Sequence, residues 1–317
     1  MRNIIITGGA GFVGRNLIGE LIKDSNNKII CLDNLSTGNE DNIKPFLKKY
    51  NNFILVIADI RDGGSVQDIF KMYKPDVVFH LAADPRLQYS NTEPLQTFEN
   101  NVNGTLNVLE ACRLYGVKRL VFASSSGVYG DVNVDTIPEY EERKPLSHYT
   151  THKLIGEELC KLYYKLYGLE VIMLRLFNIF GEYQNPSGDY SALIPKTIRR
   201  CLDFENPIIY GDGFQTRDFI YVKDVVSAFI KAGETDNKDC FGEAFNIGTG
   251  VGTSVNNIVN EIMRLTGDVN FEIIYKAPLI ESRYVKADVD KARKVLGWEV
   301  KVTLSEGLKN TINFFEE

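Results

Sequence analysis

Continuously apolar runs alternate with amphipathic stretches through the first part of the chain. Six short runs are rich in β-branched residues, namely NIIIT, KIICL, FILVI, DVVFHLA, RLVFAS and VIMLRL. Runs that are apolar throughout, rather than at alternate positions, are typical of strands covered on both faces, as in a parallel sheet. Between them we predict helices at 12–23, 64–73, 91–115 and 147–167. Strand and helix in regular succession predict a Rossmann-like, doubly wound α/β fold.

The pattern changes after Asn178. Segments such as GEYQNPSGDY and ENPIIYGDGFQTRDF are rich in Gly, Pro and Asn and are predicted to be loops. Shorter helical patterns lie among them near 190–203, 223–232, 254–265 and 304–314. We therefore predict a Rossmann domain over 1–177 and a smaller C-terminal α/β substrate lobe over 178–317, with segments near 217–232 and 243–248 returning to the first domain.

Charge and composition narrow the classes of partner. The 317 residues carry a formal net charge of −6, which argues against nucleic acid or an anionic membrane as a partner. No apolar run approaches the ~20 residues of a membrane span, and the first residues lack the long apolar region of a signal peptide. Five widely spaced cysteines without a CxxC motif are typical of reduced thiols. We therefore expect a cytoplasmic protein.

The histidines do not predict a metal site. His148 and His152 are four residues apart, but no carboxylate with the spacing of a zinc-protease motif accompanies them. Two half-exposed helix residues are the simpler interpretation, so no bound metal is expected.

A glycine-rich turn and an acidic residue predict a dinucleotide site. NIIITGGAGFVG places Gly8, Gly11 and Gly14 between a strand and an amphipathic helix, where backbone N–H groups can approach a pyrophosphate at the helix N-terminus. Asp33 closes the second strand about 20 residues later, where a carboxylate accepts hydrogen bonds from the adenosine ribose. A carboxylate repels a 2′-phosphate, and no Arg follows at once in DNLSTG. NAD is therefore predicted rather than NADP.

Two tyrosine–lysine pairs with a spacing of four residues are candidates for a catalytic pair. Tyr140 and Lys144 lie in EYEERKP, where Lys144 precedes a proline and is disfavoured from the α region. In a loop their spacing has no geometric meaning. Tyr149 instead opens the predicted helix 147–167, so that Tyr149 and Lys153 share one face of it.

Three serine hydroxyls, Ser124 to Ser126, end the predicted strand upstream of that helix. Ligands bind at the carboxyl ends of parallel strands, so this position suits oxidation of an alcohol, which needs a base near pH 7 as hydride leaves. An ordinary tyrosine pKa of about 10 must fall by about three units, or about 4 kcal/mol. The Lys153 ammonium and the positive nicotinamide ring can supply this. The alternative is an amphipathic helix with a solvated lysine.

The ordered set of motifs resembles the extended short-chain dehydrogenase/reductase family. Within it the chain is similar to the NAD-dependent nucleotide-sugar epimerases and dehydratases, most of all to UDP-glucose 4-epimerases. The resemblance covers essentially the whole chain. It rests on TGGAGFVG, DNLSTG, ADIRD, VFHLAA, NNVNGTLNVLEA, SSSGVYG, YTTHK, LRLFNIFG, GDGFQTRDFIYVKDV, FNIG and KADVDKARKVLGW. It implies NAD as the cofactor and a nucleotide sugar, UDP-linked, as the substrate.

The resemblance implies a role for each matching residue. The catalytic residues would be Ser125, Tyr149 and Lys153. NAD would be contacted by Gly8, Gly11, Phe12, Val13, Gly14, Asp33, Asn34, Asp59, Ile60, Leu81, Ala82, Ala83, Asn100, Ser124, Tyr149 and Lys153. Forked arginine side chains suit a diphosphate, and the substrate would be held by Ser125, Ser126, Tyr149, Asn178, Arg217 and Arg283.

The residues before VYG distinguish reactions within the family. Similar 4,6-dehydratases carry an Asp–Glu pair there and sugar-nucleotide decarboxylases carry a Glu, whereas this chain has Ser126 and Gly127. Neither residue can act as that acid or base, so we expect 4-epimerisation alone. Tyr149 would accept the 4-hydroxyl proton, with Ser125 bridging, as hydride passes to NAD. The 4-keto sugar would then be reduced again on its other face.

Several positions depart from the family pattern. FGEYQ replaces YGPGQ and places Glu182 near the expected mouth of the substrate site, with selection or simple solvation as equal interpretations. Asp84 and Arg86 in AADPR come close to the nicotinamide side without an assigned role. Val285 aligns with a position that gates bulky 2-substituents in related epimerases. Valine is smaller than the tyrosine that excludes N-acetyl groups, so N-acetylated sugars are expected to enter.

Alternatives stay open on the sequence alone. A nucleotide-sugar 4,6-dehydratase, a 4-epimerase of UDP-glucuronate and a keto-sugar reductase would share the family motifs, although Asp33 argues against NADPH. A non-enzymatic dinucleotide-sensing protein is disfavoured because the Tyr–Lys pair and the serine are all present. Members of the family commonly dimerise through a four-helix contact. We therefore expect a homodimer, with the helices near 91–115 and 147–167 as candidates.

Overall fold

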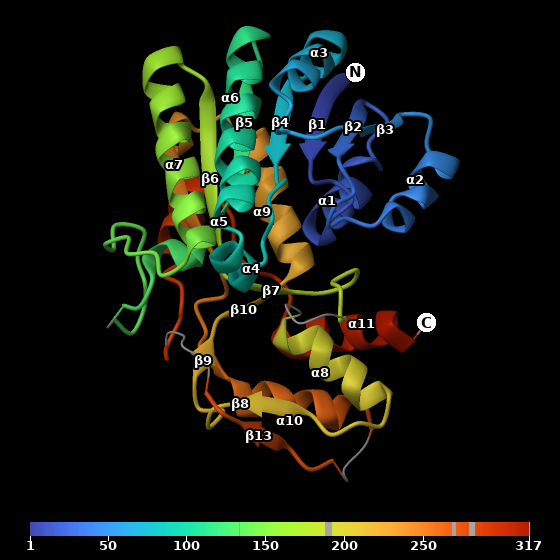
Figure 1. Ribbon diagram of the computed structural model, residues 1–317, viewed down its shortest axis with the longest axis vertical. Coiled ribbons are helices and arrows are strands. Elements are labelled where there is room, and N and C mark those ends of the chain that lie inside the picture. The colour runs from blue at the N-terminus through green and yellow to red at the C-terminus, as the bar shows by residue number, and fades with distance from the viewer. Residues whose placement is uncertain (133, 188–191, 268–270, 279–282, 317) are drawn as a thin grey trace.

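A seven-stranded, wholly parallel sheet forms the upper part of the computed structural model (Figure 1), which describes residues 1–132, 134–187, 192–267, 271–278 and 283–316. From one edge to the other the strands are β3 (Phe53–Ile57), β2 (Asn27–Asp33), β1 (Arg2–Thr7), β4 (Val77–His80), β5 (Arg119–Ser125), β6 (Glu170–Leu176) and β11 (Glu243–Ile247). Successive strands are added on one side of β1 up to β3 and on its other side from β4 onward, so the strand order reverses between β1 and β4. Ligands of doubly wound sheets bind at such a switch point, outside the carboxyl ends of the strands. The parallel sheet with helices on both faces confirms the predicted fold class.

Helices cover both faces of the sheet. On one face lie α1 (Phe12–Leu21) and α9 (Val222–Glu234); on the other lie α3 (Gly63–Tyr73), α6 (Gly104–Leu114) and α7 (His148–Tyr167) (Figure 1). Successive strand residues point to opposite faces. In β1, Ile4 and Ile6 accordingly join the apolar core under α1 and α9, whereas Ile5 joins the core under α3 and α6. This double burial explains why the strands are apolar throughout.

The predicted helix over 91–115 is wrong in its details, because a proline interrupts it. The segment contains the end of α4 (Leu87–Thr92), then α5 (Pro94–Phe98), a π-helical turn (Glu99–Asn103) and α6. Glu93 has φ −123° and ψ 59°, since a residue before proline is pushed out of the helical region. A short helix that the apolar pattern did not predict, α2 (Lys44–Lys49), also begins with a proline in its first turn.

The part of the chain after Asn178 forms short paired strands and three further helices below the sheet (Figure 1). The helices are α8 (Leu193–Leu202), α10 (Val255–Leu265) and α11 (Leu304–Glu316). The strand pairs are β7 (Asn178–Phe180) with β10 (Phe219–Tyr221), β9 (Thr216–Arg217) with β12 (Thr253–Ser254), and β8 (Ile208–Tyr210) with β13 (Ile274–Lys276). Between these, α9 and β11 belong to the large sheet and its cover. The domain boundary at residue 177 stays a prediction.

Short helical turns lie at Glu40–Asn42, Ser126–Tyr129, Lys238–Cys240 and Ala292–Leu296. Within the described ranges, no helix combines the length and the apolar character that a membrane crossing requires. The same residues contain no cluster of three His, Cys, Asp or Glu side chains arranged to hold a metal ion. The cysteine side chains at positions 31, 112, 160, 201 and 240 are buried.

Candidate active site

A cavity of about 990 Å³ lies at the carboxyl ends of the central strands. Predicted NAD-binding residues make up much of its wall: Gly8, Gly11, Phe12, Val13, Gly14, Asp33, Asn34, Ile60, Leu81, Ala82, Ala83, Asn100, Ser124, Tyr149 and Lys153. Asp59 is the predicted cofactor residue outside this lining. Of the predicted substrate residues, Ser125, Tyr149 and Asn178 line the cavity, whereas Ser126, Arg217 and Arg283 do not.

The glycine turn at the start of α1 packs so closely against neighbouring backbone that it requires residues without side chains. Gly8 has φ +72°, and a Cβ there would lie 2.7 Å from the backbone nitrogen of Ala82. A Cβ on Gly14 would lie 2.2 Å from the Gly8 carbonyl oxygen. The first N–H groups of a helix have no partner within the helix, so they are available to a bound diphosphate. The turn therefore fits the pyrophosphate of NAD.

Asp33 ends β2 beside this turn and is buried, with 7% of its surface exposed. Its two carboxylate oxygens accept hydrogen bonds from the backbone N–H groups of Ala10 at 2.9 Å and Leu35 at 2.8 Å. Burial raises the pKa of Asp33, while these two N–H groups act in the opposite direction. A carboxylate fixed in this way on the cavity wall fits the hydroxyls of an adenosine ribose.

Asp59 supports the same end of the cavity from outside its lining. Asn34 donates to the Asp59 carboxylate at 2.9 Å, and Arg61 donates to it at 2.7 Å. The hydrogen bonds from Arg61 are the main reason that the pKa of Asp59 falls to about 2. Asp59 therefore holds Asn34 in place on the wall.

Helix α7 brings Tyr149 and Lys153 to the cavity. Ser147 caps the helix and forms a capping box with Thr150, so the helix begins at His148 and Tyr149 lies in its first turn. Lys153 follows one turn later and donates to the Ala123 carbonyl of β5 at 2.7 Å. The predicted helical pair is therefore formed, whereas Tyr140 and Lys144 lie outside any helix.

Ser125 at the end of β5 lies beside Tyr149 on the cavity wall. Burial raises the pKa of Tyr149 to about 12; the neighbouring Ser125 hydroxyl lowers it in part, and the charge of Asp84 raises it further. Burial also lowers the pKa of Lys153 to about 8. The sequence predicts a lowered tyrosine pKa, but the protein groups around Tyr149 act together in the opposite direction. Additional positive charge at the site is needed to stabilise the phenolate.

The Asp84–Arg86 pair lies beside Tyr149. Arg86 lines the cavity and donates to both carboxylate oxygens of Asp84, at 2.9 and 2.5 Å. Asn101 fixes the backbone of Asp84 with one hydrogen bond to its N–H and one to its carbonyl. The sequence pointed to both residues without a role, and the structure shows a charge pair on the cavity wall.

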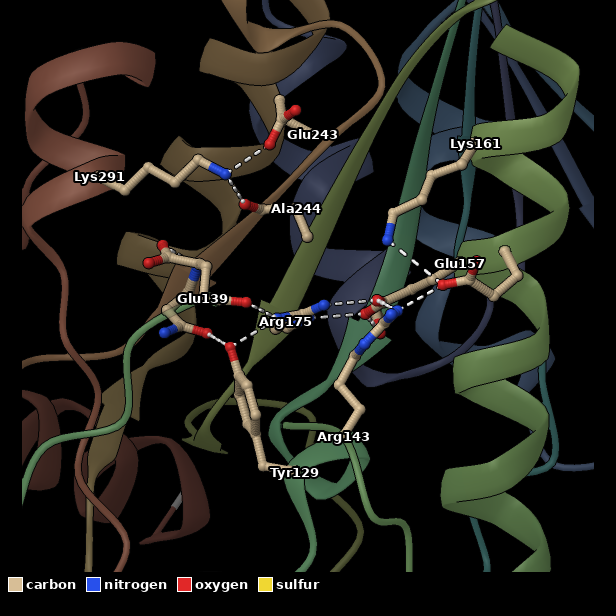
Figure 2. Close-up of polar contacts among 12 residues, drawn as sticks. Tyr129, Glu139, Arg143, Glu157, Lys161, Arg175, Glu243, Ala244 and Lys291 are labelled. Atoms are coloured by element: carbon tan, nitrogen blue, oxygen red, sulfur yellow. Dashed lines mark hydrogen bonds and ion pairs between the residues drawn. The ribbon is translucent and has the colours of Figure 1, made fainter. Parts of the chain in front are cut away.

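Sequence reasoning missed a buried polar network behind Ser125. Glu157 is fully buried on α7, one turn after Lys153, and accepts a 2.6 Å hydrogen bond from Ser124. Arg175 of β6 donates to both oxygens of Glu157, at 2.9 and 2.7 Å. Figure 2 shows Arg175 between Glu157 and the hydroxyl of Tyr129, to which it also donates at 2.7 Å. The Ser124 hydroxyl therefore contacts Glu157.

A signal for this network was present in the sequence. VIMLRL places a charged residue inside an otherwise apolar strand, and a buried charge requires a partner. The helical spacing of Lys153 and Glu157 also places the carboxylate on the same face as the catalytic pair. Which acid meets Arg175 depends on packing between separate elements, so the sequence alone does not identify it.

Backbone hydrogen bonds bring the segments of the predicted diphosphate-binding residues Arg217 and Arg283 close to the segment of Asn178. Thr216 donates its N–H to the Arg283 carbonyl at 2.9 Å, and Asn178 donates its N–H to the Asp218 carbonyl at 3.0 Å. This pairing places the segments of Asn178, Arg217 and Arg283 in neighbouring positions. The Arg283 side chain, however, is exposed and donates to Asp212 at 2.9 Å.

Two other positions singled out in the sequence also have defined surroundings. The carboxylate of Glu182 accepts a 2.6 Å hydrogen bond from Tyr221 and pairs with Lys223 at 3.2 Å, so it is more than a solvated loop acid. Val285 packs against the small apolar core that contains Tyr129 and Phe177.

Comparison with known proteins agrees with this geometry. Residues 4–248 match the model of the NAD dependent epimerase/dehydratase family. A putative UDP-glucose 4-epimerase of Methanocaldococcus jannaschii is 40% identical over 99% of this chain and 98% of its own length. UDP-glucose 4-epimerase of Mycolicibacterium smegmatis is 34% identical over 98% of this chain and 97% of its own length.

Solved structures give the same result. UDP-glucose 4-epimerase of Thermotoga maritima, with UDP-glucose, superposes with a TM-score of 0.93 at 37% identity, covering 99% of this chain and 98% of that one. Other relatives are named as a UDP-glucuronate 4-epimerase, a UDP-N-acetyl-alpha-D-glucosaminuronate decarboxylase and a dTDP-D-glucose 4,6-dehydratase, and solved neighbours contain NAD. With the glycine turn, Asp33 and the Ser125–Tyr149–Lys153 group on one cavity, this chain belongs to the NAD-dependent epimerase/dehydratase family, with NAD as its cofactor.

Proposed function

We propose that the protein catalyses 4-epimerisation of a UDP-linked sugar, either the UDP-glucose/UDP-galactose pair or its N-acetylated counterpart. The observation that carries the proposal is the convergence of Ser125, Tyr149 and Lys153 on the NAD cavity without an additional acid before VYG. Gly127 occupies one of the two positions where such an acid would stand. A Cβ there would lie 2.4 Å from Cγ2 of Thr150, so a glutamate at this position would require the Thr150 side chain to move.

In the proposed reaction Tyr149 accepts the proton of the sugar 4-hydroxyl. The Ser125 hydroxyl, which lies beside Tyr149, bridges the two oxygens. Lys153 holds its charge near the Tyr149 ring, with Nζ 5.9 Å from the ring centroid, and favours the phenolate. Bound NAD supplies the hydride acceptor and later the hydride donor. After the 4-keto sugar turns over, Tyr149 returns the proton to the oxygen of the opposite epimer.

For the nucleotide diphosphate we propose Asn178, Arg217 and Arg283 as contacts. Asn178 lines the cavity, and the neighbouring backbones of the two arginines support their inclusion. Arg283 must exchange its pairing with Asp212 for the diphosphate. This exchange costs little free energy, because an ion pair between exposed side chains contributes little to stability.

We also propose a homodimer. Apolar side chains are exposed on neighbouring helices of one face: Leu95 (82%) and Phe98 (39%) on α5, Leu106 (39%) on α6, and Leu162 (46%) and Leu166 (58%) on α7. Contiguous exposed apolar surface of this kind marks an association site. A second copy of the same helices would bury it in a symmetric contact.

The test of the reaction is NMR of the purified protein, without added cofactor, incubated in turn with UDP-glucose, UDP-N-acetylglucosamine and UDP-glucuronate. We expect the 4-epimer of one of the first two sugars to appear, because NAD that is regenerated in each cycle can stay bound. A 4-keto-6-deoxy product would instead identify a dehydratase, and conversion of UDP-glucuronate alone would identify that sugar as the substrate.

Replacement Tyr149→Phe tests the proposed base. Removing a positioned acid–base group typically costs about 10²- to 10⁴-fold in rate, so we expect epimerisation to fall by at least that factor while NAD stays bound. Absorbance of the purified variant and its melting temperature provide the control for cofactor content and folding. Near-normal turnover by Tyr149→Phe would contradict the assignment.

A further inference from the structure

The backbone of Tyr183 has an unusual conformation, with φ +68°. Positive φ values favour glycine, and a bulky side chain adopts them only where its surroundings hold it there. Such residues cluster at functional sites and ligand clamps. Tyr183 lies in the FGEYQ segment that departs from the family pattern, directly after β7, and it lines the NAD cavity.

The Tyr183 ring is held between two elements that are far apart in the sequence. The guanidinium carbon of Arg15, on α1, lies 4.1 Å from the ring centroid, and Arg15 also donates to the Tyr183 hydroxyl at 2.8 Å. The centroid of the Phe314 ring, on α11, lies 4.5 Å from that of the Tyr183 ring. A cation–π contact, an aromatic contact and a hydrogen bond therefore converge on one side chain.

The backbone beside Tyr183 is fixed as well. Asn16 of α1 donates to the Glu182 carbonyl at 3.0 Å and to the Phe12 carbonyl at 2.9 Å. The Glu182 carboxylate is held in turn by Tyr221 and Lys223, as described above. The segment after β7 is thus tied both to the first turn of α1 and to the lower part of the molecule, and Figure 1 shows it passing between α1 and α11.

These contacts place an aromatic wall beside the diphosphate turn. Tyr183 and Phe314 line the same cavity as Gly11, Phe12 and Gly14, and Arg15 directly follows Gly14 in the chain. The glycine turn supplies N–H groups for binding, but its glycines have no side chains that could cover a bound ligand. The two rings supply the apolar cover that the turn lacks.

We propose that Arg15, Tyr183 and Phe314 form a clamp that slows the release of NAD from its cavity. In this proposal the Tyr183 ring covers a cofactor that lies against the glycine turn, and release requires the ring to break its contacts with Arg15 and Phe314. An enzyme that regenerates NAD in each cycle benefits from slow release. The inference rests on NAD binding and is independent of which sugar the protein converts.

The test measures the rate at which NAD leaves the purified holoprotein, by assaying free NAD in filtrates after dilution. For Tyr183→Ala we expect release at least about tenfold faster, because the cation–π and aromatic contacts are both lost. Tyr183→Phe keeps the ring and loses the hydroxyl, so its release is expected to be only about two- to threefold faster. Tyr140→Ala serves as the matched control, since Tyr140 is 90% exposed and outside the cavity.

Each outcome decides the proposal. Release from Tyr183→Ala at the rate of Tyr140→Ala overturns it. Faster release together with a lower melting temperature of the NAD-stripped variant also overturns it, because general loosening would then be the cause. If Tyr183→Ala does not fold, Phe314→Leu replaces it, with faster release expected and unchanged release overturning the clamp. Sugar turnover is not the readout, so failure of the proposed reaction and failure of the clamp are distinguishable.

Discussion

At the residue scale, the protein groups around Tyr149 do not lower its pKa far enough for it to act as a base at neutral pH. Burial and Asp84 raise its pKa to about 12, and Ser125 offsets this only in part. Lys153 is itself buried, with a pKa lowered to about 8, so its charge is partly lost in mildly alkaline solution. Deprotonation of Tyr149 is therefore expected to depend on the charge that arrives with oxidised NAD.

This dependence predicts the direction of two pKa changes. The charged form of tyrosine is an anion, so added positive charge lowers its pKa and removal of positive charge raises it. We expect Tyr149 to titrate at lower pH in the NAD-loaded protein than in the stripped protein, and at higher pH in NAD-loaded Lys153→Met. Ultraviolet absorbance of the phenolate, with Tyr149→Phe as the subtracted background, measures each midpoint. Equal midpoints in loaded and stripped protein would contradict the argument.

Some residues of the site could be predicted from the sequence because their roles depend only on the neighbouring part of the chain. Gly8 and Gly14 are required by a turn that no side chain fits, and Asp33 ends the strand that follows it. Glu157 and Tyr183 could not be predicted, because each acquires its role from partners on other elements. The raised pKa of Tyr149 likewise depends on burial, which a spacing of four residues does not reveal.

At the element scale, α7 carries the proposed catalytic groups Tyr149 and Lys153 and also the Glu157 carboxylate, which bonds the helix to the sheet. Glu157 lies two turns after Tyr149 and joins α7 to both β5 and β6, through Ser124 and Arg175. A helix anchored at two neighbouring strands cannot slide along the sheet without breaking a buried charge pair. The distance between Tyr149 and Ser125 is therefore expected to depend on Glu157.

Replacement of the buried pair tests its energetic role. Glu157→Gln leaves the Arg175 charge buried without its counter-ion, and we expect a loss of about 3–5 kcal/mol in the free energy of unfolding. The double variant Glu157→Leu/Arg175→Met removes both charges, and apolar replacements of a buried pair are often neutral or stabilising, so most of that loss should be recovered. Urea unfolding measures both. A double variant as unstable as the single one would show that the unpaired charge is not the cause.

The boundaries of elements were predicted well where capping and periodicity agree, as in α7 with its capping box at Ser147. They were predicted poorly where an apolar pattern continues through a local break. The pattern over 91–115 persists across Pro94, since α5 and α6 cover the same face, but the backbone cannot stay helical through Glu93. Apolar periodicity reports which face is covered, whereas proline decides where the helix stops.

At the scale of the whole molecule, the exposed apolar side chains of α5, α6 and α7 predict the assembly state. We expect Leu166→Glu to convert the dimer to a monomer, because a carboxylate would be desolvated in the contact. Leu47→Glu is the matched control, since Leu47 is exposed on α2 rather than on these helices. Light scattering during size-exclusion chromatography measures the mass of each. A Leu166→Glu variant with the mass of the parent would rule out this face as the contact.

The regular succession of β and α segments allowed the parallel sheet and its helical cover to be predicted from sequence. The surroundings of Arg217 and Arg283 could not. Their segments reach the site through pairing between Thr216 and Arg283 and between β7 and β10, which joins short loops far apart in the chain. Short strands within loops carry too few apolar residues to predict such pairing.

The cofactor cavity is lined by Gly8, which is translated early, and by Phe314 and Phe315, which are translated late. Domains form as the chain emerges from the ribosome, with earlier residues folding first. The glycine turn and Asp33 can therefore assemble while α11 is still being translated, and at that stage the aromatic wall does not exist. NAD therefore meets a crevice without the aromatic wall before α11 docks and one with that wall afterwards. A newly made chain thus has an interval for loading its cofactor before the Tyr183–Phe314 contact exists.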